Sequence, residues 1–140
     1  MIHNKKYSVV AIGNAMLDLV CEVPEQFLKE EGISKGAMNL VSMERSNSIL
    51  KIVKPIKETA GGSAANTIST LSKLGLKTGY IGKIADDPKG KVFKKDLIDS
   101  SIFYNTKFLD ISNIEATGKC IVLITPDKER TMNTYLGATE

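Results

Sequence analysis

The sequence has few of the residues from which several common catalytic sites are built. Its 140 residues contain one histidine, His3, two cysteines, Cys21 and Cys120, and no tryptophan. A single histidine this close to a chain end argues against a Ser-His-Asp or Cys-His catalytic group and against a histidine-based metal cluster. The cysteines form no CxxC pair, which is typical of two free thiols in a reducing cytoplasm.

The sequence also has little net charge and no apolar run of membrane length. Nineteen Lys and Arg against sixteen Asp and Glu leave a net charge of +3, and aromatic residues are only 6%. The basic residues are scattered, a pattern that argues against nucleic-acid binding. The uncharged run from Tyr7 to Leu17 follows two lysines as in a signal peptide, but Asp18 closes it and no small-residue cleavage site follows. At this length the run predicts a buried strand rather than a membrane span.

Length and composition predict one globular domain, because 42% hydrophobic and 25% charged residues are ordinary for a soluble protein. Turn residues and hydrophobic spacing predict strands and helices in alternation. Strands are expected at 7–13, 19–23, 38–41 and 78–82, helices at 42–53, 63–74 and 87–98, a loosely alternating segment at 103–109, and a hairpin from 118–125 and 131–136. This order indicates an α/β class with antiparallel additions.

Finer features of these elements are also predicted. The β-branched run at 7–13 suits a central strand covered on both faces. The expected helix caps are Ser42, Ser63 and Asp87, the last followed by a proline. Helical spacing places Ile52, Leu74 and Ile98, among others, on the inward faces of their helices.

The turn Gly61-Gly62-Ser63 is the first candidate for a ligand site. It matches neither GxxxxGK[ST] nor GxGxxG, so it lacks the lysine that a P-loop directs at phosphates. Its free amides and the helix that follows could hold an oxygen of a small ligand. A tight turn needed only for packing a strand against a helix is the equally weighted alternative.

The second candidate is Gly13-Asn14-Ala15-Met16-Leu17-Asp18, which follows the first expected strand. A carboxylate can accept two hydroxyl hydrogen bonds, and an amide adds a donor and an acceptor. Asn14 and Asp18 would therefore suit the vicinal hydroxyls of a sugar. The alternative is that both side chains only cap local turns, as Asx residues commonly do.

Taken together, four segments resemble the amino-terminal half of the ribokinase/PfkB family of sugar and nucleoside kinases. They are Gly13-Asn14 to Asp18, Gly61-Gly62-Ser63-Ala64-Ala65-Asn66, Gly82 to Gly90 with Asp86-Asp87, and Thr117-Gly118-Lys119-Cys120 to Pro126-Asp127-Lys128-Glu129-Arg130-Thr131-Met132. The GNxxxD and TGxC elements are most similar to adenosine-kinase-like members. One departure is Ala85, where many members have a glycine.

The resemblance implies roles for several of these residues. In such kinases the carboxylate and amide of GNxxxD hold sugar hydroxyls, which implies that role for Asp18 and Asn14. The glycine-rich turn and its asparagine add hydroxyl contacts, which implies roles for Gly62, Ser63 and Asn66. The implied acceptor is an adenosine-like nucleoside or a sugar.

The resemblance further implies a ribokinase-like three-layer α/β sandwich, present as its amino-terminal half, with a small β-strand lid over the acceptor. It places Cys120 near a nucleoside base and Met38 in the lining of the lid, although a buried thiol and plain lid packing are the alternatives. The single incomplete kinase domain would divide into lid strands at about 14–23, 36–41 and 117–136 and an α/β core at about 7–13 and 43–109.

The family's catalytic aspartate lies in a GAGD-like element, and neither this element nor the ATP-binding loops occur in the 140 residues. The expectation is that ATP and Mg²⁺ serve the full-length enzyme, which phosphorylates a primary hydroxyl, and that this chain alone binds neither and is inactive or nearly so. No catalytic or metal-binding residue is assigned within it. A natural truncation, an incomplete reading frame and a deliberately shortened chain would all give this sequence.

Two other functional classes remain open. One is a binding module in which Asn14, Asp18 and Asn66 hold a sugar or nucleoside without chemistry. The other is an interaction protein that forms a homodimer through its lid strands or self-associates through the open edges of a truncated sheet. No nucleic-acid or membrane partner is expected, and the expected location is the cytoplasm.

Overall fold

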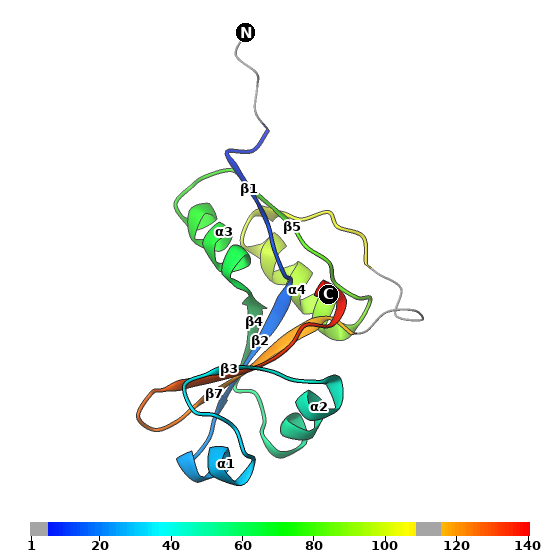
Figure 1. The fold of residues 1–140 in the computed structure, drawn as a ribbon. Coiled ribbons are helices and arrows are strands. Elements are labelled where there is room, and N and C mark those ends of the chain that lie inside the picture. Colours follow the sequence, from blue (N-terminus) through cyan, green and yellow to red (C-terminus); the bar gives the residue numbers. More distant parts are fainter. Residues whose placement is uncertain (1–5, 109–115) are drawn as a thin grey trace.

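The computed structural model describes residues 6–108 and 116–140, so His3 and Leu109, the last residue of the expected core, lie outside the described residues. In chain order the elements are β1 (Val9–Ile12), β2 (Met16–Glu22), α1 (Glu25–Glu30), β3 (Met38–Leu40), α2 (Met43–Ile52), β4 (Lys57–Gly61), α3 (Ser63–Lys73), β5 (Thr78–Ile81), α4 (Pro88–Asp99), β6 (Ile102–Phe103), β7 (Gly118–Ile124), β8 (Arg130–Tyr135) and a 3₁₀ turn η1 (Gly137–Thr139). They form two parts, an α/β unit and a second sheet with its own helices (Figure 1).

The α/β unit contains a parallel sheet of strand order β1-β5-β6 with α3 and α4 beside it. Its core includes Ile68 from α3, Tyr80 from β5 and Phe93 from α4, all nearly inaccessible to solvent. The other face of the sheet is open, since Val10 and Ile12 are at least half exposed. The expectation of a central β1 covered on both faces was therefore wrong: within the described residues β1 lies at the sheet edge, and the buried cluster covers only the face of Val9 and Ala11.

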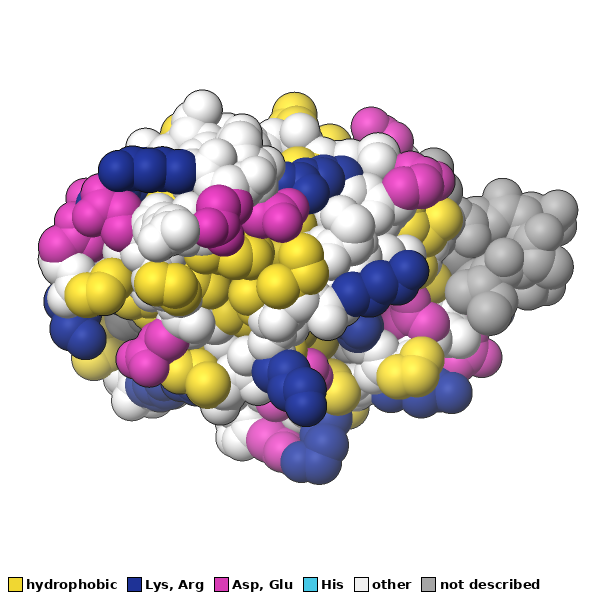
Figure 2. All heavy atoms as spheres, turned by 90° about the horizontal axis from the view of Figure 1, so that it is seen from below, with side chains coloured by type: hydrophobic (Ala, Val, Ile, Leu, Met, Phe, Trp, Pro, Cys, Tyr) yellow, Lys and Arg dark blue, Asp and Glu magenta, His cyan; other side chains and the backbone are white. Residues whose placement is uncertain are grey.

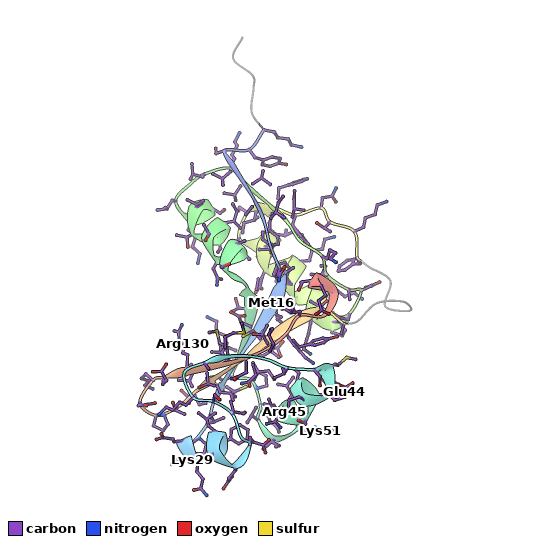
Figure 3. All side chains as sticks on the ribbon, viewed as in Figure 1. Met16, Lys29, Glu44, Arg45, Lys51 and Arg130 are labelled. Carbon is purple, nitrogen blue, oxygen red and sulfur yellow. The ribbon has the colours of Figure 1, made fainter. Side chains whose placement is uncertain are left out.

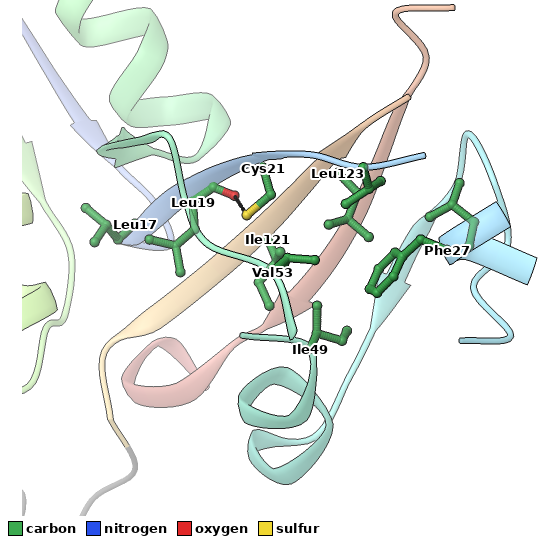
Figure 4. Packing of buried hydrophobic residues seen from close by; sticks show 10 residues of the cluster. Leu17, Leu19, Cys21, Phe27, Ile49, Val53, Ile121 and Leu123 are labelled. Atoms are coloured by element: carbon green, nitrogen blue, oxygen red, sulfur yellow. Dashed lines mark hydrogen bonds between the residues drawn. The ribbon is translucent and has the colours of Figure 1, made fainter. Parts of the chain in front are cut away.

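The second sheet has the strand order β3-β8-β7-β2-β4. The expected hairpin is present as the antiparallel pair β7 and β8, and β2 pairs with β7 in parallel. Strand β4 was not predicted; its sequence, Lys-Glu-Thr-Ala-Gly, has no apolar alternation, and its backbone pairing with β2 places it in the sheet. One face of this sheet packs against α1 and α2 through a cluster drawn in Figure 4, which includes Leu19, Phe27, Ile49 and Ile121.

Two of the three expected helix caps are confirmed. The Ser42 hydroxyl accepts a hydrogen bond from the Arg45 amide at 3.2 Å, and the Asp87 carboxylate accepts one from the Gly90 amide at 2.7 Å. The third prediction was wrong, because Ser63 is the first helical residue of α3 and Gly62 is the N-cap. Gly62 takes this place at φ +94°, a conformation that side chains other than glycine rarely adopt.

The carboxyl-terminal ends of three helices are more exposed than the hydrophobic periodicity of the sequence predicted. Ile52, Leu74 and Ile98 are each more than half exposed, so their assignment to inward faces was wrong. Each lies in the last turn of its helix or at its C-cap. Hydrophobic spacing identifies the face of a helix, but it does not show where along that face the packed neighbour ends.

The surface shows no segregation of charge on the face drawn in Figure 2, where basic and acidic side chains are interspersed around hydrophobic ones. Figure 3 shows the labelled charged residues of α2, Glu44, Arg45 and Lys51, along the helix. Within 6–108 and 116–140, none of the helices has the length and apolarity to cross a membrane.

Candidate functional site

Asp18 lies in the middle of β2, on the face of the second sheet that is turned away from α1 and α2. The alternation along β2 is regular: Leu17 and Leu19 on either side of Asp18 are fully buried in the helix-covered core, and Asp18 is half-buried on the other face. Its neighbours across the sheet are Thr59 on β4 and Cys120 on β7. This position, given by strand register, places a carboxylate on the open face of the sheet.

Gly61 makes room for the Asp18 carboxylate. A Cβ atom added to Gly61 would lie 2.1 Å from Asp18 Oδ1 and 2.4 Å from Oδ2, far inside van der Waals contact. The carboxylate therefore rests directly against the backbone of the last residue of β4. Sequence reasoning treated Gly61 only as part of a turn; the doubled glycine was the available signal, but the pairing of β4 with β2 was needed to interpret it.

The loop after β1 and the diglycine corner are in direct contact. A Cβ on Gly62 would lie 2.6 Å from the Asn14 carbonyl oxygen, and a Cβ on Gly13 would lie 2.6 Å from Ala64 Cβ. The Tyr80 hydroxyl holds the same loop by donating a hydrogen bond to the Gly13 carbonyl at 2.9 Å. The first strand end and the glycine corner, which are far apart in sequence, are thus neighbours, with the Asn14 side chain exposed beside them.

The structure places Ser63 and Asn66 on the first turn of α3, both exposed. The backbone N–H of Asn66 donates a hydrogen bond to the Gly62 carbonyl at 2.9 Å, so the helix starts directly at the corner. Asn66 also lines a cavity of about 370 Å³ whose other lining residues include Thr59 and Asp96 but not Asp18. Asn14, Asp18 and Gly62 are therefore clustered around the corner, and Asn66 borders a neighbouring hollow.

Cys120 lies next to Asp18 across the pair β2 and β7, and Thr134 lies next to Cys120 across the hairpin. The Thr134 hydroxyl donates to the Cys120 sulfur at 3.4 Å. Burial raises the pKa of the Cys120 thiol and outweighs the lowering by the hydrogen bond from Thr134, so the thiol is neutral at physiological pH. Cys120 therefore offers the site a small, weakly polar wall rather than a nucleophile.

Met38 lies on β3, at the edge of the same sheet, and it is 55% exposed. Strands β8 and β7 separate it from the strand of Asp18, a lateral distance of about 14 Å for three strand spacings. Met38 is thus on the open face but lies well outside direct contact with the carboxylate. Any ligand that touched both residues would have to extend across the sheet.

The Asp18 carboxylate determines the electrostatic character of the site. Among the described residues, no group donates a hydrogen bond to the Asp18 side chain, and burial raises its pKa above the usual value. In the described ranges no three His, Cys, Asp or Glu side chains group together to hold a metal ion. A half-buried acceptor of this kind is suited to hydroxyl donors supplied by a ligand.

The raised pKa of Asp18 predicts that the residue lowers the stability of the fold at neutral pH. Burial disfavours the ionised form of Asp18 in the folded state. The contribution of this group to the free energy of unfolding is therefore largest below its unfolded pKa, near 4, and it is lost as pH rises through the folded pKa. We expect Asp18→Asn to raise the free energy of unfolding at pH 7 and to lose this advantage below about pH 4. Urea unfolding at both pH values measures the difference.

Asp127 provides a control of opposite sign. Hydrogen bonds from Lys35 at 2.6 Å and from Thr125 at 2.6 Å lower the pKa of this carboxyl. Its stabilising effect is therefore present above the unfolded pKa and is lost as pH falls, so Asp127→Asn should destabilise the fold at pH 7 and not in acid. If Asp18→Asn and Asp127→Asn shift stability in the same direction at pH 7, the electrostatic interpretation of Asp18 is wrong.

Comparison with known proteins gives the family. The model of the pfkB family carbohydrate kinases matches residues 6–140. The 5-dehydro-2-deoxygluconokinase of Bacillus licheniformis is 36% identical over 87 residues, 62% of this chain and 20% of that protein. The enzyme of the same name from Shouchella clausii is 26% identical over 143 residues, 97% of this chain and 37% of that protein.

Solved structures agree with this family. An adenosine kinase from Sinorhizobium meliloti superposes with a TM-score of 0.88 at 41% identity, covering 96% of this chain and 41% of that one. A probable sugar kinase from Rhizobium etli gives 0.87 at 36% identity, covering 96% and 40%. Adenosine kinase from Schistosoma mansoni in complex with adenosine gives 0.76 at 25% identity, covering 93% and 38%.

The chain therefore spans about two fifths of the length of these structures and a smaller share of the curated relatives. The expected ribokinase-like α/β fold is confirmed by these superpositions, and so is the resemblance noted from the sequence motifs. The chain belongs to the pfkB family of carbohydrate kinases.

Proposed function

We propose that this chain forms the acceptor-binding side of a kinase that transfers the γ-phosphate of ATP to a primary hydroxyl of a sugar or an adenosine-like nucleoside. The observation that carries the proposal is the Asp18 carboxylate, held against Gly61 on the open sheet face with no donor from the described protein. A carboxylate in this position can accept hydrogen bonds from two vicinal hydroxyls of one ligand. The relatives named as adenosine kinase and 5-dehydro-2-deoxygluconokinase support a hydroxylated acceptor.

The other sequence-predicted residues have supporting roles in this proposal. The Asn14 side chain, beside the diglycine corner, adds an amide donor and acceptor, and the corner at Gly62 and Ser63 lets the ligand approach the backbone closely. Asn66, one turn into α3, contacts the part of the ligand that extends toward its own hollow. Cys120 forms a wall beside Asp18, and the sheet that contains Met38 covers the acceptor as a lid.

Phosphoryl transfer needs positioning of both substrates and stabilisation of developing charge. ATP, with Mg²⁺, would supply the phosphoryl group. The described residues contain no group of three His, Cys, Asp or Glu side chains that could hold a metal ion, and the 140 residues contain no GAGD-like element. This chain's own contribution is to bind and orient the acceptor hydroxyls. Asp18 is a poor candidate for the base that removes the hydroxyl proton, because the diol already engages it. We therefore expect this chain alone to be inactive or nearly so.

A binding module without chemistry is the second candidate, because the site residues would be the same. The two buried free cysteines, Cys21 and Cys120, are consistent with the cytoplasmic location that we propose for either function. Catalysis would require the residues of the longer relatives that this chain does not span.

The test is calorimetric titration of the chain with adenosine, 2′-deoxyadenosine and ribose. If the vicinal hydroxyls are the recognised group, 2′-deoxyadenosine should bind about 10- to 150-fold more weakly than adenosine, since one hydrogen bond to a charged acceptor contributes about 1.5–3 kcal/mol. Equal affinities for adenosine and its deoxy analogue would contradict diol recognition. No binding of any of the three at millimolar concentration would contradict the proposed function itself.

A further inference from the structure

Strand β4 joins the two parts of the molecule at the candidate site. It pairs with β2 in the second sheet, and its last residue, Gly61, is the first residue of the diglycine corner that leads into α3 (Figure 1). Within the described residues its other edge has no strand partner. Because the sequence of β4 has no apolar alternation, its position depends on backbone hydrogen bonds. A bond at the free edge of β4 therefore bears on the position of Gly61, against which the Asp18 carboxylate rests.

Asp96 of α4 makes such a bond at the free edge of β4. Its Oδ2 atom accepts a hydrogen bond from the backbone N–H of Ala60 at 2.8 Å. The Ala60 side chain packs against the core of the α/β unit, which includes Leu97, the residue after Asp96. In the part of the chain that the structure describes, Asp96 takes part in no ion pair. Strand β4 thus belongs to the second sheet by its pairing and is attached to the α/β unit through Ala60.

A second carboxylate of the same region holds the strand on the other side of Asp18. Asp87, the N-cap of α4, accepts a hydrogen bond from the backbone N–H of Thr117 at 2.8 Å, directly before β7. Strands β4 and β7 flank β2, the strand of Asp18. Helix α4 and its cap therefore hold both neighbours of that strand. Asp87 also caps the helix through Gly90, so a substitution at Asp96 tests the attachment of the sheet more cleanly.

We infer that Asp96 is a positioning residue for the acceptor site. By accepting the Ala60 N–H it fixes the adjoining Gly61, and the Gly61 backbone sets where the Asp18 carboxylate stands relative to the diglycine corner. This inference rests on the proposed function, because it concerns the placement of the group that is proposed to accept the ligand's hydroxyls. Asp96 itself does not contact the ligand. Binding groups must be held within about 0.5 Å of their productive positions, so a bond between the two parts at this point contributes to affinity.

Three substitutions test the hydrogen bond by calorimetric titration. Asp96→Ala should weaken the binding of adenosine and of ribose by about tenfold, because Asp18 remains and only its placement is lost. Asp96→Asn keeps an oxygen that can accept the same N–H and should restore affinity to within about threefold of the unaltered chain. The control is Asp99→Ala, which removes the same charge from the same helix and the same hollow and should leave affinity unchanged.

These variants separate the hydrogen bond from the charge of Asp96. The Asn variant lacks the charge but keeps an acceptor, so an effect of the charge would appear in it at full size. Affinity as low in Asp96→Asn as in Asp96→Ala would overturn the inference. An equal loss of affinity in Asp99→Ala would overturn it as well.

Combining substitutions tests whether Asp96 acts through Asp18. If its only effect on binding is to place the Asp18 carboxylate, adding Asp96→Ala to Asp18→Ala should change adenosine affinity by less than about twofold. A residue that merely stabilised the fold would weaken binding by the same factor in both backgrounds. That additive result would overturn the positioning role.

NMR observes the bond in the unaltered 140-residue chain, without any substitution. A scalar coupling across the hydrogen bond should connect the backbone ¹⁵N of Ala60 with the carboxyl ¹³C of Asp96. The Ala60 amide proton should move upfield in Asp96→Ala and much less in Asp96→Asn, since the amide oxygen still accepts the bond. Absence of the coupling from the folded, unaltered chain would overturn the inference, even where Asp96→Ala does not fold.

Failure of this inference can be distinguished from failure of the proposed function. Binding of adenosine or ribose that Asp18→Ala weakens and Asp96→Ala does not would overturn the role of Asp96 and leave the proposed function standing. If the coupling between Ala60 and Asp96 is present but the unaltered chain binds neither ligand, the proposed function is contradicted, and the positioning role is overturned with it.

Discussion

Replacing Asp18 by alanine is expected to weaken the binding of adenosine or ribose by about 30- to 150-fold. The value follows from the loss of a charged hydrogen-bond acceptor, which contributes roughly 2–3 kcal/mol when the partner hydroxyls are left without it. Two properties of Asp18 make the effect large: the carboxylate is half-buried, and among the described residues it has no protein donor, so the ligand supplies its hydrogen bonds. Calorimetric titration of the two proteins measures the ratio.

The control for this prediction is Glu58→Ala. Glu58 lies on the neighbouring strand β4 but pairs with Leu19, so it belongs to the opposite side of the sheet from Asp18. It is exposed, and its removal changes the net charge by the same amount. A general electrostatic effect would weaken binding in both variants; the site proposed here requires that only Asp18→Ala does so. Equal affinity of Asp18→Ala and the unaltered chain would show that the role given to Asp18 is wrong.

Gly61→Ala is expected to have the second large effect, on stability and on binding together. The new methyl group would lie 2.1–2.4 Å from the Asp18 carboxylate atoms, so either the carboxylate or strand β4 must move. Forced repacking of this kind costs about 1–3 kcal/mol of unfolding free energy. Because the displaced group is the proposed hydroxyl acceptor, ligand affinity should fall to about the same extent as in Asp18→Ala. Urea unfolding and titration of one preparation measure both effects.

Gly79→Ala is the matched control, because Gly79 is also a buried strand glycine without positive φ. A Cβ there would meet its nearest atom, on Val10, at 3.5 Å, an ordinary contact. Gly79→Ala should change the free energy of unfolding by less than about 1 kcal/mol, and it should leave ligand affinity unchanged. Because the new methyl group clashes with the Asp18 side chain, Gly61→Ala should lower the free energy of unfolding much less in an Asp18→Ala background. An unchanged cost in that background would place the strain elsewhere than at the carboxylate.

The sequence was sufficient for much of the local structure and for the family. Apolar β-branched runs and turn residues predicted β1, β5 and the β7–β8 hairpin, and Ser42 and Asp87 predicted the starts of α2 and α4. These features are local, because a cap or a turn is formed by residues within a few positions of one another. The motif order likewise identified the family that the comparisons confirmed.

Errors arose where the outcome depended on what packs against an element. The runs containing Val10 and Ile98 read as buried on periodicity alone, but the buried cluster of the described chain leaves both exposed. Strand β4 was missed because its residues carry no strand pattern and it is held by backbone pairing with β2. Propensity and spacing describe single segments, whereas these results depend on contacts between segments.

The chemistry of the candidate site was contained in the sequence, because the types of residue able to hold sugar hydroxyls could be recognised from GNxxxD and the diglycine turn. The tertiary structure alone decided which residues become neighbours: it set Asp18 against Gly61 and Cys120 against Thr134. The physical reason is register. In a sheet the partner of each residue is set by the pairing of distant strands, and a shift of one position would move every side chain to the opposite face.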